Sequence, residues 1–466
     1  MMKNLLFLAM LAGLVSPIAF PSLSAQSLTV TLKNPNKQAL KDAPVCVPVP
    51  AVGDIKSATV TIDGKEIPCQ MDDLNEDGKM DELAFVVDIA KKGKLTAEIT
   101  FSAMSAPADR YPSRVHAQMW FKDNDKKRSY TEKQHIPTDT VSERVDNMYS
   151  KMMHHGPAFE NEMVAYRVYF DKKQSTDLYG KRVRQLELAD GLWYSSEVPS
   201  LVKERNFGDD IILVGQTISI GTLRGWDDSK DDPAFASKPS AGKVADPCMV
   251  MIDPFDYRQA HIMAKGPVRT VVDMNVEGWQ YKGHKLNLKS RYILYAGNRE
   301  CQVIQYLSEG DEGVTRTATQ GAAPMRRAPK TDLSKLEFVT GVLKVGVFNT
   351  DSVNLAGKHY IYDNQGLCAS FGKDWPDGNH KLYPVMSAAA LAVSIAPSYV
   401  TRTIDRKDQI LYGVHPDENN QITYRMAFCA PDKEGPQLTD KPWTPKSWFS
   451  WCKNWNKIKP LEVVIK

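Results

Sequence analysis

The side chains best suited to chemistry are concentrated between His154 and Lys181. In this stretch two histidines precede a Gly-Pro turn, and glutamates, tyrosines and an arginine follow within a few residues. Histidine exchanges protons near neutral pH, and glutamate or tyrosine can also serve as an acid or a base. The residues expected to be catalytic are His155, Glu160, Glu162 and Tyr166.

Cationic and aromatic side chains in and beyond this stretch suit an acidic sugar. Arginine and lysine pair with carboxylates, and tyrosine or tryptophan rings offer flat surfaces for sugar rings. The residues expected to bind substrate are Arg167, Asp171, Tyr179, Lys181, Trp226, His261 and Arg269. A single histidine or arginine is usually structural, so the hypothesis depends on so many such groups occurring together.

Alternation along this stretch predicts one strand with two charged faces. Read with a period of two, Glu160, Glu162 and Tyr166 fall on one face, and Arg167 and Asp171 fall on the other. Buried charges need ion pairs, water or a ligand, so both faces require partners. The alternative is a solvent-facing edge of a sheet, where a charge cluster is purely structural.

Several reactions remain open for these groups. In a hydrolase, Glu160 and Glu162 would be acid and base, although two carboxylates on one strand face do not by themselves flank a bond. In a lyase, His155 or Tyr166 would remove the C5 proton of a uronate, and an arginine, Arg167 or Arg269, would neutralise its carboxylate. A non-catalytic carbohydrate-binding protein and a mutarotase-like epimerase are the alternatives. The chain has no GxSxG elbow, Walker loop or Rossmann fingerprint, and we expect no organic cofactor.

An acidic loop near the N-terminus predicts a structural calcium site. Its spacing places oxygen ligands at positions one, three, five and nine of a calcium loop, with glycine at six and a backbone carbonyl at seven. The expected ligands are Asp73, Asn75, Asp77, Lys79, Asp81 and Glu82. Position twelve is Ala84, and the flanks read as strands, so this is not an EF-hand. The alternative is a hairpin turn rich in Asp, Asn and Gly for backbone reasons.

The N-terminal residues predict export. Lys3, the apolar run Leu5 to Val15 and the small residues before Gln26 have the pattern of a signal peptide over residues 1–25. No cysteine marks a lipoprotein anchor, and no later apolar run is long enough to span a membrane. We therefore expect a periplasmic or secreted protein. Its seven cysteines include no CxxC pair, and their odd number leaves at least one thiol without an intramolecular partner.

Composition and patterning predict a folded, mainly β protein. The chain is 42% hydrophobic and 25% charged with a net charge of +3, which gives no general case for nucleic-acid binding. Short β-branched segments separated by turn residues favour antiparallel β-sandwiches with few helices. We expect an N-terminal sandwich over residues 26–106 and a main domain over 107–466. Trp448, Trp451 and Trp455 have helical spacing and are expected to pack on the core.

Three motifs resemble a known family. The segments HHGPAFENEMVAYRVYFD with DLYGK, MDDLNEDGKMDELAFVVDI and GPVRTVV are similar to the domain of unknown function 4861 family. That family comprises exported proteins of Bacteroidetes gene clusters for polysaccharide use. The resemblance implies a β-supersandwich of the galactose-mutarotase-like type and a carbohydrate ligand. It carries over no catalytic residue, because the family's function is unknown, and a shared fold does not establish an activity.

Overall fold

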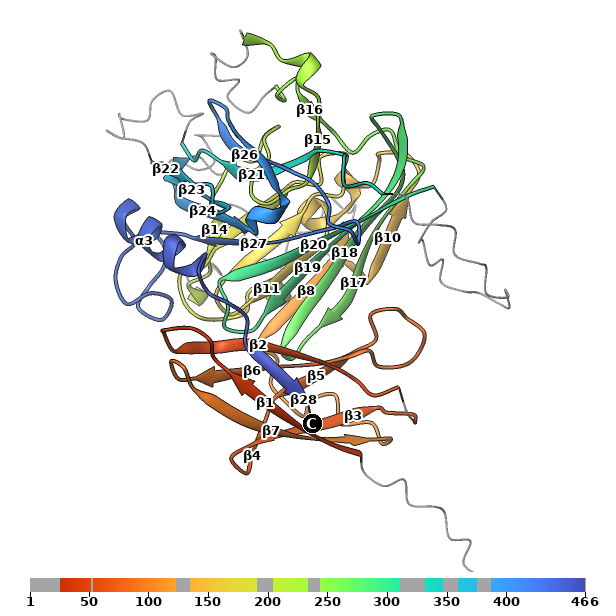
Figure 1. The fold of residues 1–466 in the computed structure, drawn as a ribbon, viewed down its shortest axis with the longest axis vertical. Helices are drawn as coiled ribbons and strands as arrows, with labels where there is room; N and C mark the ends of the chain where they lie inside the picture. Colours follow the sequence, from red (N-terminus) through yellow and green to blue (C-terminus); the bar gives the residue numbers. More distant parts are fainter. Residues whose placement is uncertain are drawn as a thin grey trace, which may run out of the picture.

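The computed structural model describes residues 26–51, 53–122, 135–190, 204–233, 244–310, 332–346, 359–374 and 387–465. The predicted signal peptide, residues 1–25, lies outside them. Figure 1 shows a smaller β-sandwich, which begins the chain, below a larger body of sheets. The strand pairings among the described residues are antiparallel, so the predicted mainly β, antiparallel architecture is confirmed.

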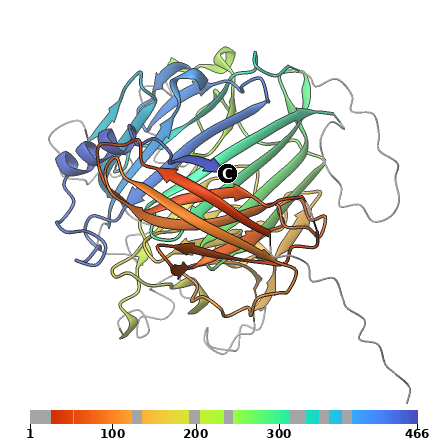
Figure 2. The same ribbon diagram turned by 60° about the horizontal axis from the view of Figure 1, so that its bottom comes forward.

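The smaller sandwich has two sheets. The first, in order, is β28 (Glu462–Ile465), β1 (Gln26–Lys33), β7 (Lys94–Ser102), β3 (Ser57–Ile62) and β4 (Lys65–Ile67). The second is β2 (Leu40–Pro48), β6 (Glu82–Ile89) and β5 (Cys69–Asp72). Along β7, Ala97, Ile99 and Phe101 alternate into the core while the residues between them face outward. Strand β28, near the C-terminus, pairs with β1, so the first and last strands of the described residues lie side by side in one sheet (Figure 2).

The larger body is built on a nine-stranded sheet. Its order is β10 (Thr140–Glu143), β17 (Tyr257–Lys265), β18 (Arg269–Tyr281), β19 (His284–Tyr295), β20 (Glu300–Glu309), β27 (Gln421–Cys429), β24 (Ser387–Ile395), β23 (Leu367–Asp374) and β22 (Tyr360–Tyr362). One face of this sheet packs into the main hydrophobic core through residues such as Val272, Tyr292 and Val303.

Two more sheets complete that core. The six-stranded sheet has the order β14 (Asp209–Asp210), β13 (Thr176–Gly180), β12 (Ala165–Val168), β11 (Ala158–Asn161), β8 (Val115–Phe121) and β9 (Ile136–Thr138). The five-stranded sheet has the order β16 (Met249–Val250), β15 (Arg224–Trp226), β21 (Phe338–Leu343), β26 (Gln409–Val414) and β25 (Val400–Asp405).

Helices are few among the described residues. The 3-10 helices are η2 (Tyr149–Lys151), η3 (Met153–His155), η4 (Leu188–Asp190), η5 (Asp228–Lys230) and η6 (Pro397–Tyr399). The α-helix α3 (Pro445–Trp455) starts at a capping box formed by Thr444 and Ser447. Trp448 and Trp455 are buried against β23, β24 and β27, which confirms the predicted structural role of the tryptophan stripe. No helix in the described part of the chain has the length and apolarity needed to cross a membrane.

All seven cysteines carry free thiols. Six of them are buried and only Cys46 is exposed. The fold of the described residues therefore depends on packing rather than on disulfide cross-links.

Candidate functional site

The stretch from His154 to Lys181 is not one strand, so the prediction of two charged faces is wrong. The chain turns after β11, because the Asn161 side-chain oxygen accepts hydrogen bonds from the backbone N–H groups of Met163 (2.8 Å) and Val164 (3.0 Å). Strands β11, β12 and β13 then run as an antiparallel meander. The turn reverses the strand, so Glu160 and Arg167 lie on the same face of the sheet.

This face points away from the main core and is rich in polar groups. Two rows of residues cross it from strand to strand. One row is Gln118, Ala158, Arg167 and Asp177, and the other is His116, Glu160, Ala165, Tyr179 and Asp210. Three predicted site residues, Glu160, Arg167 and Tyr179, therefore share one face of the sheet, where all three are buried. We call this face of the sheet the polar face.

Tyr166 lies on the opposite side of β12. Its ring stacks on Phe159 at 5.6 Å and meets Phe428 edge-on at 5.1 Å, and its side chain has no exposed surface. Burial raises its pKa well above the ordinary tyrosine value. The predicted catalytic role of Tyr166 is corrected to a core role, because a ligand cannot reach it.

A buried charge network occupies the centre of the polar face. Arg167 Nε donates to Asp177 Oδ2 at 3.0 Å, and Arg167 Nη2 lies 3.3 Å from Asp210 Oδ2. The Tyr169 hydroxyl donates to the same Asp177 oxygen at 2.5 Å. Burial, reinforced by the nearby Asp177 charge, raises the pKa of Asp210 well above its ordinary value. Because Arg167 is 3% exposed and engaged by protein carboxylates, its role is to hold this network rather than to meet substrate directly.

His155 lies at the edge of this network, and its side chain is partly exposed. Its ring stacks on Tyr149 with centroids 4.2 Å apart and an angle of 7° between planes. Its Nδ1 lies 3.0 Å from the Tyr149 carbonyl oxygen, which can only accept, so Nδ1 carries the proton and Nε2 the lone pair. Burial lowers the pKa of His155 to about 4, and the charges of Lys122 and Arg167 add to this effect. His155 is therefore neutral, and available as a base, at pH 7.

The backbone at this point is strained. His154 and His155 have φ values of 59° and 60°, in the left-handed region that costs non-glycine residues about 1–2 kcal/mol each. Buried His154 is held by Gln118, whose Nε2 lies 3.1 Å from His154 Nε2. The following Gly156 is required, because a Cβ there would lie 1.9 Å from the Val168 carbonyl oxygen. Consecutive strained residues held by their surroundings are typical of functional sites.

Lys173 supplies a partly exposed cation near the same two rings, Tyr149 and Tyr169, that His155 contacts. Its Nζ lies 5.2 Å from the Tyr169 ring centroid and 5.9 Å from that of Tyr149. It is 3.5 Å from the predicted binding residue Asp171, whose other oxygen accepts from the Lys173 backbone N–H at 2.8 Å. Asp171 thus orients the turn that presents Lys173.

Sequence reasoning missed several residues of this site. Lys173 lies two positions from Asp171 and could have been found as a cation at a turn. Four others come from separate strands or from η2 and give no local signal: His116, Gln118, Tyr149 and Asp210.

Glu160 and Lys181 form a fully buried ion pair at the edge of the polar face. The Glu160 carboxylate also accepts from the backbone N–H groups of Glu187 (2.8 Å) and Leu188 (2.6 Å). Lys181 donates in addition to the carbonyl oxygens of Asn161 and Gln185, each at 2.7 Å. The predicted catalytic role of Glu160 and the predicted binding role of Lys181 are therefore corrected to a structural pair, because every charge is satisfied inside the protein.

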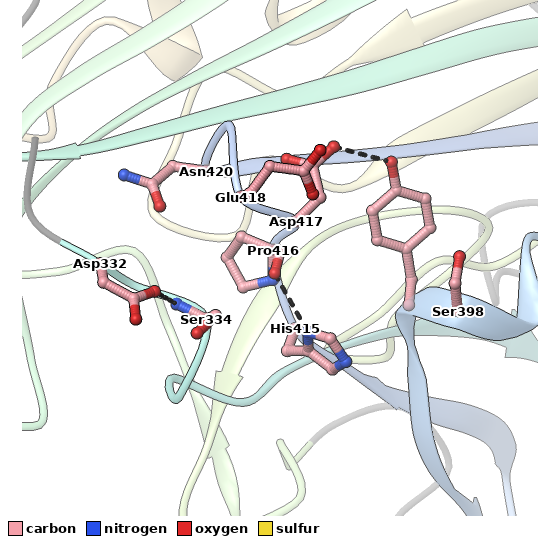
Figure 3. A pocket seen from close by; sticks show the side chains of 9 residues that line it. Asp332, Ser334, Ser398, His415, Pro416, Asp417, Glu418 and Asn420 are labelled. Carbon is pink, nitrogen blue, oxygen red and sulfur yellow. Dashed lines mark hydrogen bonds between the residues drawn. The ribbon is translucent and has the colours of Figure 1, made fainter.

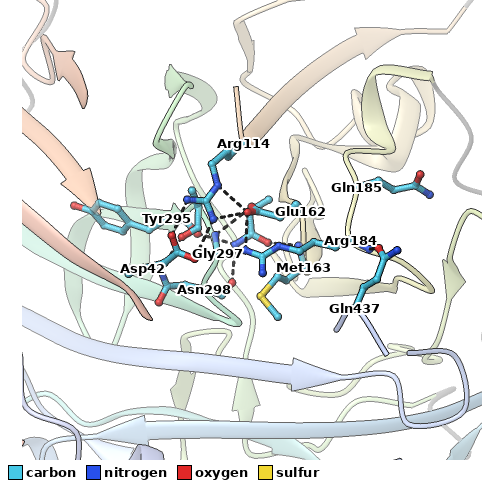
Figure 4. Close-up of polar contacts among 12 residues, drawn as sticks. Asp42, Arg114, Glu162, Met163, Arg184, Gln185, Tyr295, Gly297, Asn298 and Gln437 are labelled. Carbon is cyan, nitrogen blue, oxygen red and sulfur yellow. Dashed lines mark hydrogen bonds and ion pairs between the residues drawn. The ribbon is translucent and has the colours of Figure 1, made fainter. Parts of the chain in front are cut away.

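Glu162 belongs to the joint between the smaller sandwich and the larger body. Figure 4 shows Arg114 between Asp42 of the sandwich and Glu162 of the body, at 2.6 Å from each, with Arg184 3.0 Å from Glu162. Burial alone would raise the pKa of Glu162, but hydrogen bonds from Arg184 and Arg114 outweigh it and lower the pKa. Glu162 therefore stays ionised as a joint residue, and its predicted catalytic role is corrected.

The remaining predicted residues lie apart from the polar face. Arg269 is buried in the joint, where Nε donates to Asp72 (2.8 Å) and Nη2 to Glu82 (2.7 Å). Trp226 is buried on β15 and donates to Asp228 at 2.8 Å. His261 lies on β17, with Nε2 3.4 Å from Glu76. These three do not join His155, because they belong to other sheets.

The acidic loop forms many of its own hydrogen bonds. Asp73 accepts from the Gly78 N–H (2.9 Å), Asn75 from that of Asp77 (2.9 Å), and Asp81 from that of Leu74 (2.7 Å). The second Asp73 carboxylate oxygen is buried without a hydrogen-bond partner. Within the described ranges, no three His, Cys, Asp or Glu side chains are grouped so as to hold a metal ion. Calcium at this loop stays a prediction.

A comparison with protein families gives a match over most of the chain. A family model described as a domain of unknown function, DUF4861, matches residues 32–463. No curated protein matches the sequence.

Solved structures give only distant likenesses. An α-mannosidase from Enterococcus faecalis V583 is 6% identical with a TM-score of 0.44, over 94% of this chain and 46% of that one. A glycosyl hydrolase family 38 protein from Enterococcus faecalis is 6% identical with a TM-score of 0.42, over 94% and 47%. A structure described as an aldose 1-epimerase from Klebsiella pneumoniae is 8% identical with a TM-score of 0.26, over 68% and 88%. The chain thus spans about half the length of the first two, and TM-scores this low carry no information about activity.

Proposed function

Because the chain belongs to the DUF4861 family, which has no assigned activity, we propose its function from the polar face: an exported carbohydrate-active enzyme that cleaves uronate-containing oligosaccharides as a lyase. The proposal rests on the exposure, protonation and orientation of His155. It is partly exposed, neutral at pH 7 and oriented by a stack on Tyr149 and a hydrogen bond to the Tyr149 carbonyl.

Elimination needs a base and a nearby positive charge. His155 Nε2 removes the C5 proton of the uronate, the C5–H electron pair forms the C4–C5 double bond, and the C4–O bond breaks toward the leaving sugar. The leaving oxygen takes up a proton from water, and the protonated His155 returns its proton to the solvent. The C5 proton is acidic only when the adjacent carboxylate is neutralised. Lys173 provides that charge, and the Tyr149 and Tyr169 rings flank it.

A hydrolase has less support from the same geometry. Hydrolysis of a glycosidic bond uses two carboxyl groups on opposite sides of that bond. Asp177 and Asp210 contact one guanidinium, that of Arg167, and both are almost fully buried. They therefore hold the site together and do not flank a substrate.

Incubation with pectic, alginate and glycosaminoglycan oligosaccharides tests the proposal. We expect a rise in ultraviolet absorbance from unsaturated uronate, lost in His155→Gln and retained in His261→Gln, a matched change of a partly exposed histidine on β17. New reducing ends without that absorbance would show that the protein is a hydrolase and not a lyase. Binding of an oligosaccharide without turnover would point to the carbohydrate-binding alternative. If no oligosaccharide is bound or turned over, the carbohydrate proposal is rejected.

A further inference from the structure

A cavity of about 680 Å³ lies away from the polar face, at the turn between β26 and β27. Figure 3 shows its wall built from three segments, with Asp332 and Ser334 on one side, Ser398 on the other and the turn from His415 to Asn420 between them. The volume falls in the usual range of about 300–1,000 Å³ for small-molecule sites.

Several polar groups of this cavity are held in fixed orientations. The Asp417 Oδ1 atom accepts from the backbone N–H groups of Asn419 (2.8 Å) and Gln421 (3.0 Å), and the Tyr399 hydroxyl lies 3.3 Å from Oδ2. His415 Nδ1 lies 3.0 Å from the Pro416 carbonyl oxygen, so Nδ1 is the donor and Nε2 is left as an acceptor.

The cavity therefore presents acceptors and an apolar surface. Asp332, Asp417, Glu418 and His415 Nε2 accept hydrogen bonds, and the Tyr399 ring and Pro416 add apolar area. Its described lining contains no lysine or arginine. The carboxylates are not grouped for a cation, because no set of three metal-ligating side chains occurs among the described residues.

From this lining we infer a second binding site, which takes a neutral sugar unit. Sugar hydroxyls are donors that match carboxylate and imidazole acceptors, and the flat face of a sugar ring packs on an aromatic ring. A uronate is disfavoured, because its carboxylate would face acidic side chains with no basic residue in the described lining to balance them. The two proposed sites thus prefer different ligands. The site at Lys173 prefers an acidic sugar, and the site at Asp417 prefers a neutral one.

Binding of neutral and acidic trisaccharides to the full mature chain tests this inference independently of the proposed reaction. Mannotriose, cellotriose and galactotriose serve as neutral probes and trigalacturonate as the acidic probe, with dissociation constants from calorimetry. We expect Asp417→Asn and Tyr399→Ala each to weaken binding of a neutral probe at least tenfold while trigalacturonate binding is unchanged. Lys173→Ala is the matched control and should do the reverse.

Three results would overturn the neutral-sugar site. The first is the absence of millimolar binding by every neutral probe, and the second is equal weakening of neutral binding by Lys173→Ala. In the third, Asp417→Asn and Tyr399→Ala keep wild-type affinity. Unchanged melting temperatures of the variants verify that a loss of affinity is not a loss of fold. Failure of uronate binding alone would count against the His155 proposal and not against this site.

Discussion

Replacement of Glu160 by glutamine should destabilise the protein strongly. Glu160 neutralises Lys181 with both side chains fully buried, and its carboxylate also accepts from two backbone N–H groups. Glutamine keeps the shape but leaves the lysine charge buried without a counter-charge. Breaking a buried pair in this way costs about 3–5 kcal/mol. That is a large part of a typical total stability of about 5–15 kcal/mol.

Urea unfolding followed by tryptophan fluorescence measures this loss. Glu98→Gln, on the exposed face of β7, is the matched control and should change the free energy of unfolding by at most about 0.5 kcal/mol. The double variant Glu160→Gln with Lys181→Met should regain stability, because no buried charge is left unpaired. If Glu160→Gln unfolds at the same urea concentration as Glu98→Gln yet loses all activity, the structural assignment of Glu160 is wrong and the residue is catalytic.

Four further predictions concern His155, the joint and the acidic loop. His155 should remain neutral by NMR until about pH 4, so activity should fall off only near that pH; a midpoint near 6.5 would contradict the burial argument. Because its pKa is lower in the folded than in the unfolded state, His155 contributes stability above about pH 6.5 that is lost as the pH falls toward 4, and His155→Gln should flatten this part of the stability profile. Arg114→Ala should cost about 1.5–3 kcal/mol and speed proteolysis between the sandwich and the body, with Lys65→Ala as an exposed control. Millimolar calcium should raise the melting temperature and Asp73→Ala should abolish the rise; identical melting curves with calcium and chelator would reject the site.

Local sequence signals marked a segment rich in polar groups but did not predict its geometry. The His-His-Gly-Pro turn marked His155, and charge density marked Arg167 and Tyr179, all on or beside the polar face. The same density also marked Glu160, Glu162 and Arg269, and these three, like Arg167, are engaged in internal ion pairs. Spacing cannot separate these groups, because a charge paired inside the protein and a charge facing a ligand look alike along the chain.

The sequence by itself determined the mainly β architecture and the packing role of the Trp448 stripe. These depend on periodicity and on turn residues, which act over a few positions. Only the tertiary structure decided which charges face one another. The Asn161 turn moved Glu160 and Arg167 to one face, and β14 brought Asp210 to Arg167 across 43 residues. Strand β28 closed the first sheet from the far end of the chain. Such pairings depend on the register of strands that are distant in sequence. They are stabilised by burial of side chains in the folded protein, and a local sequence pattern does not predict that burial.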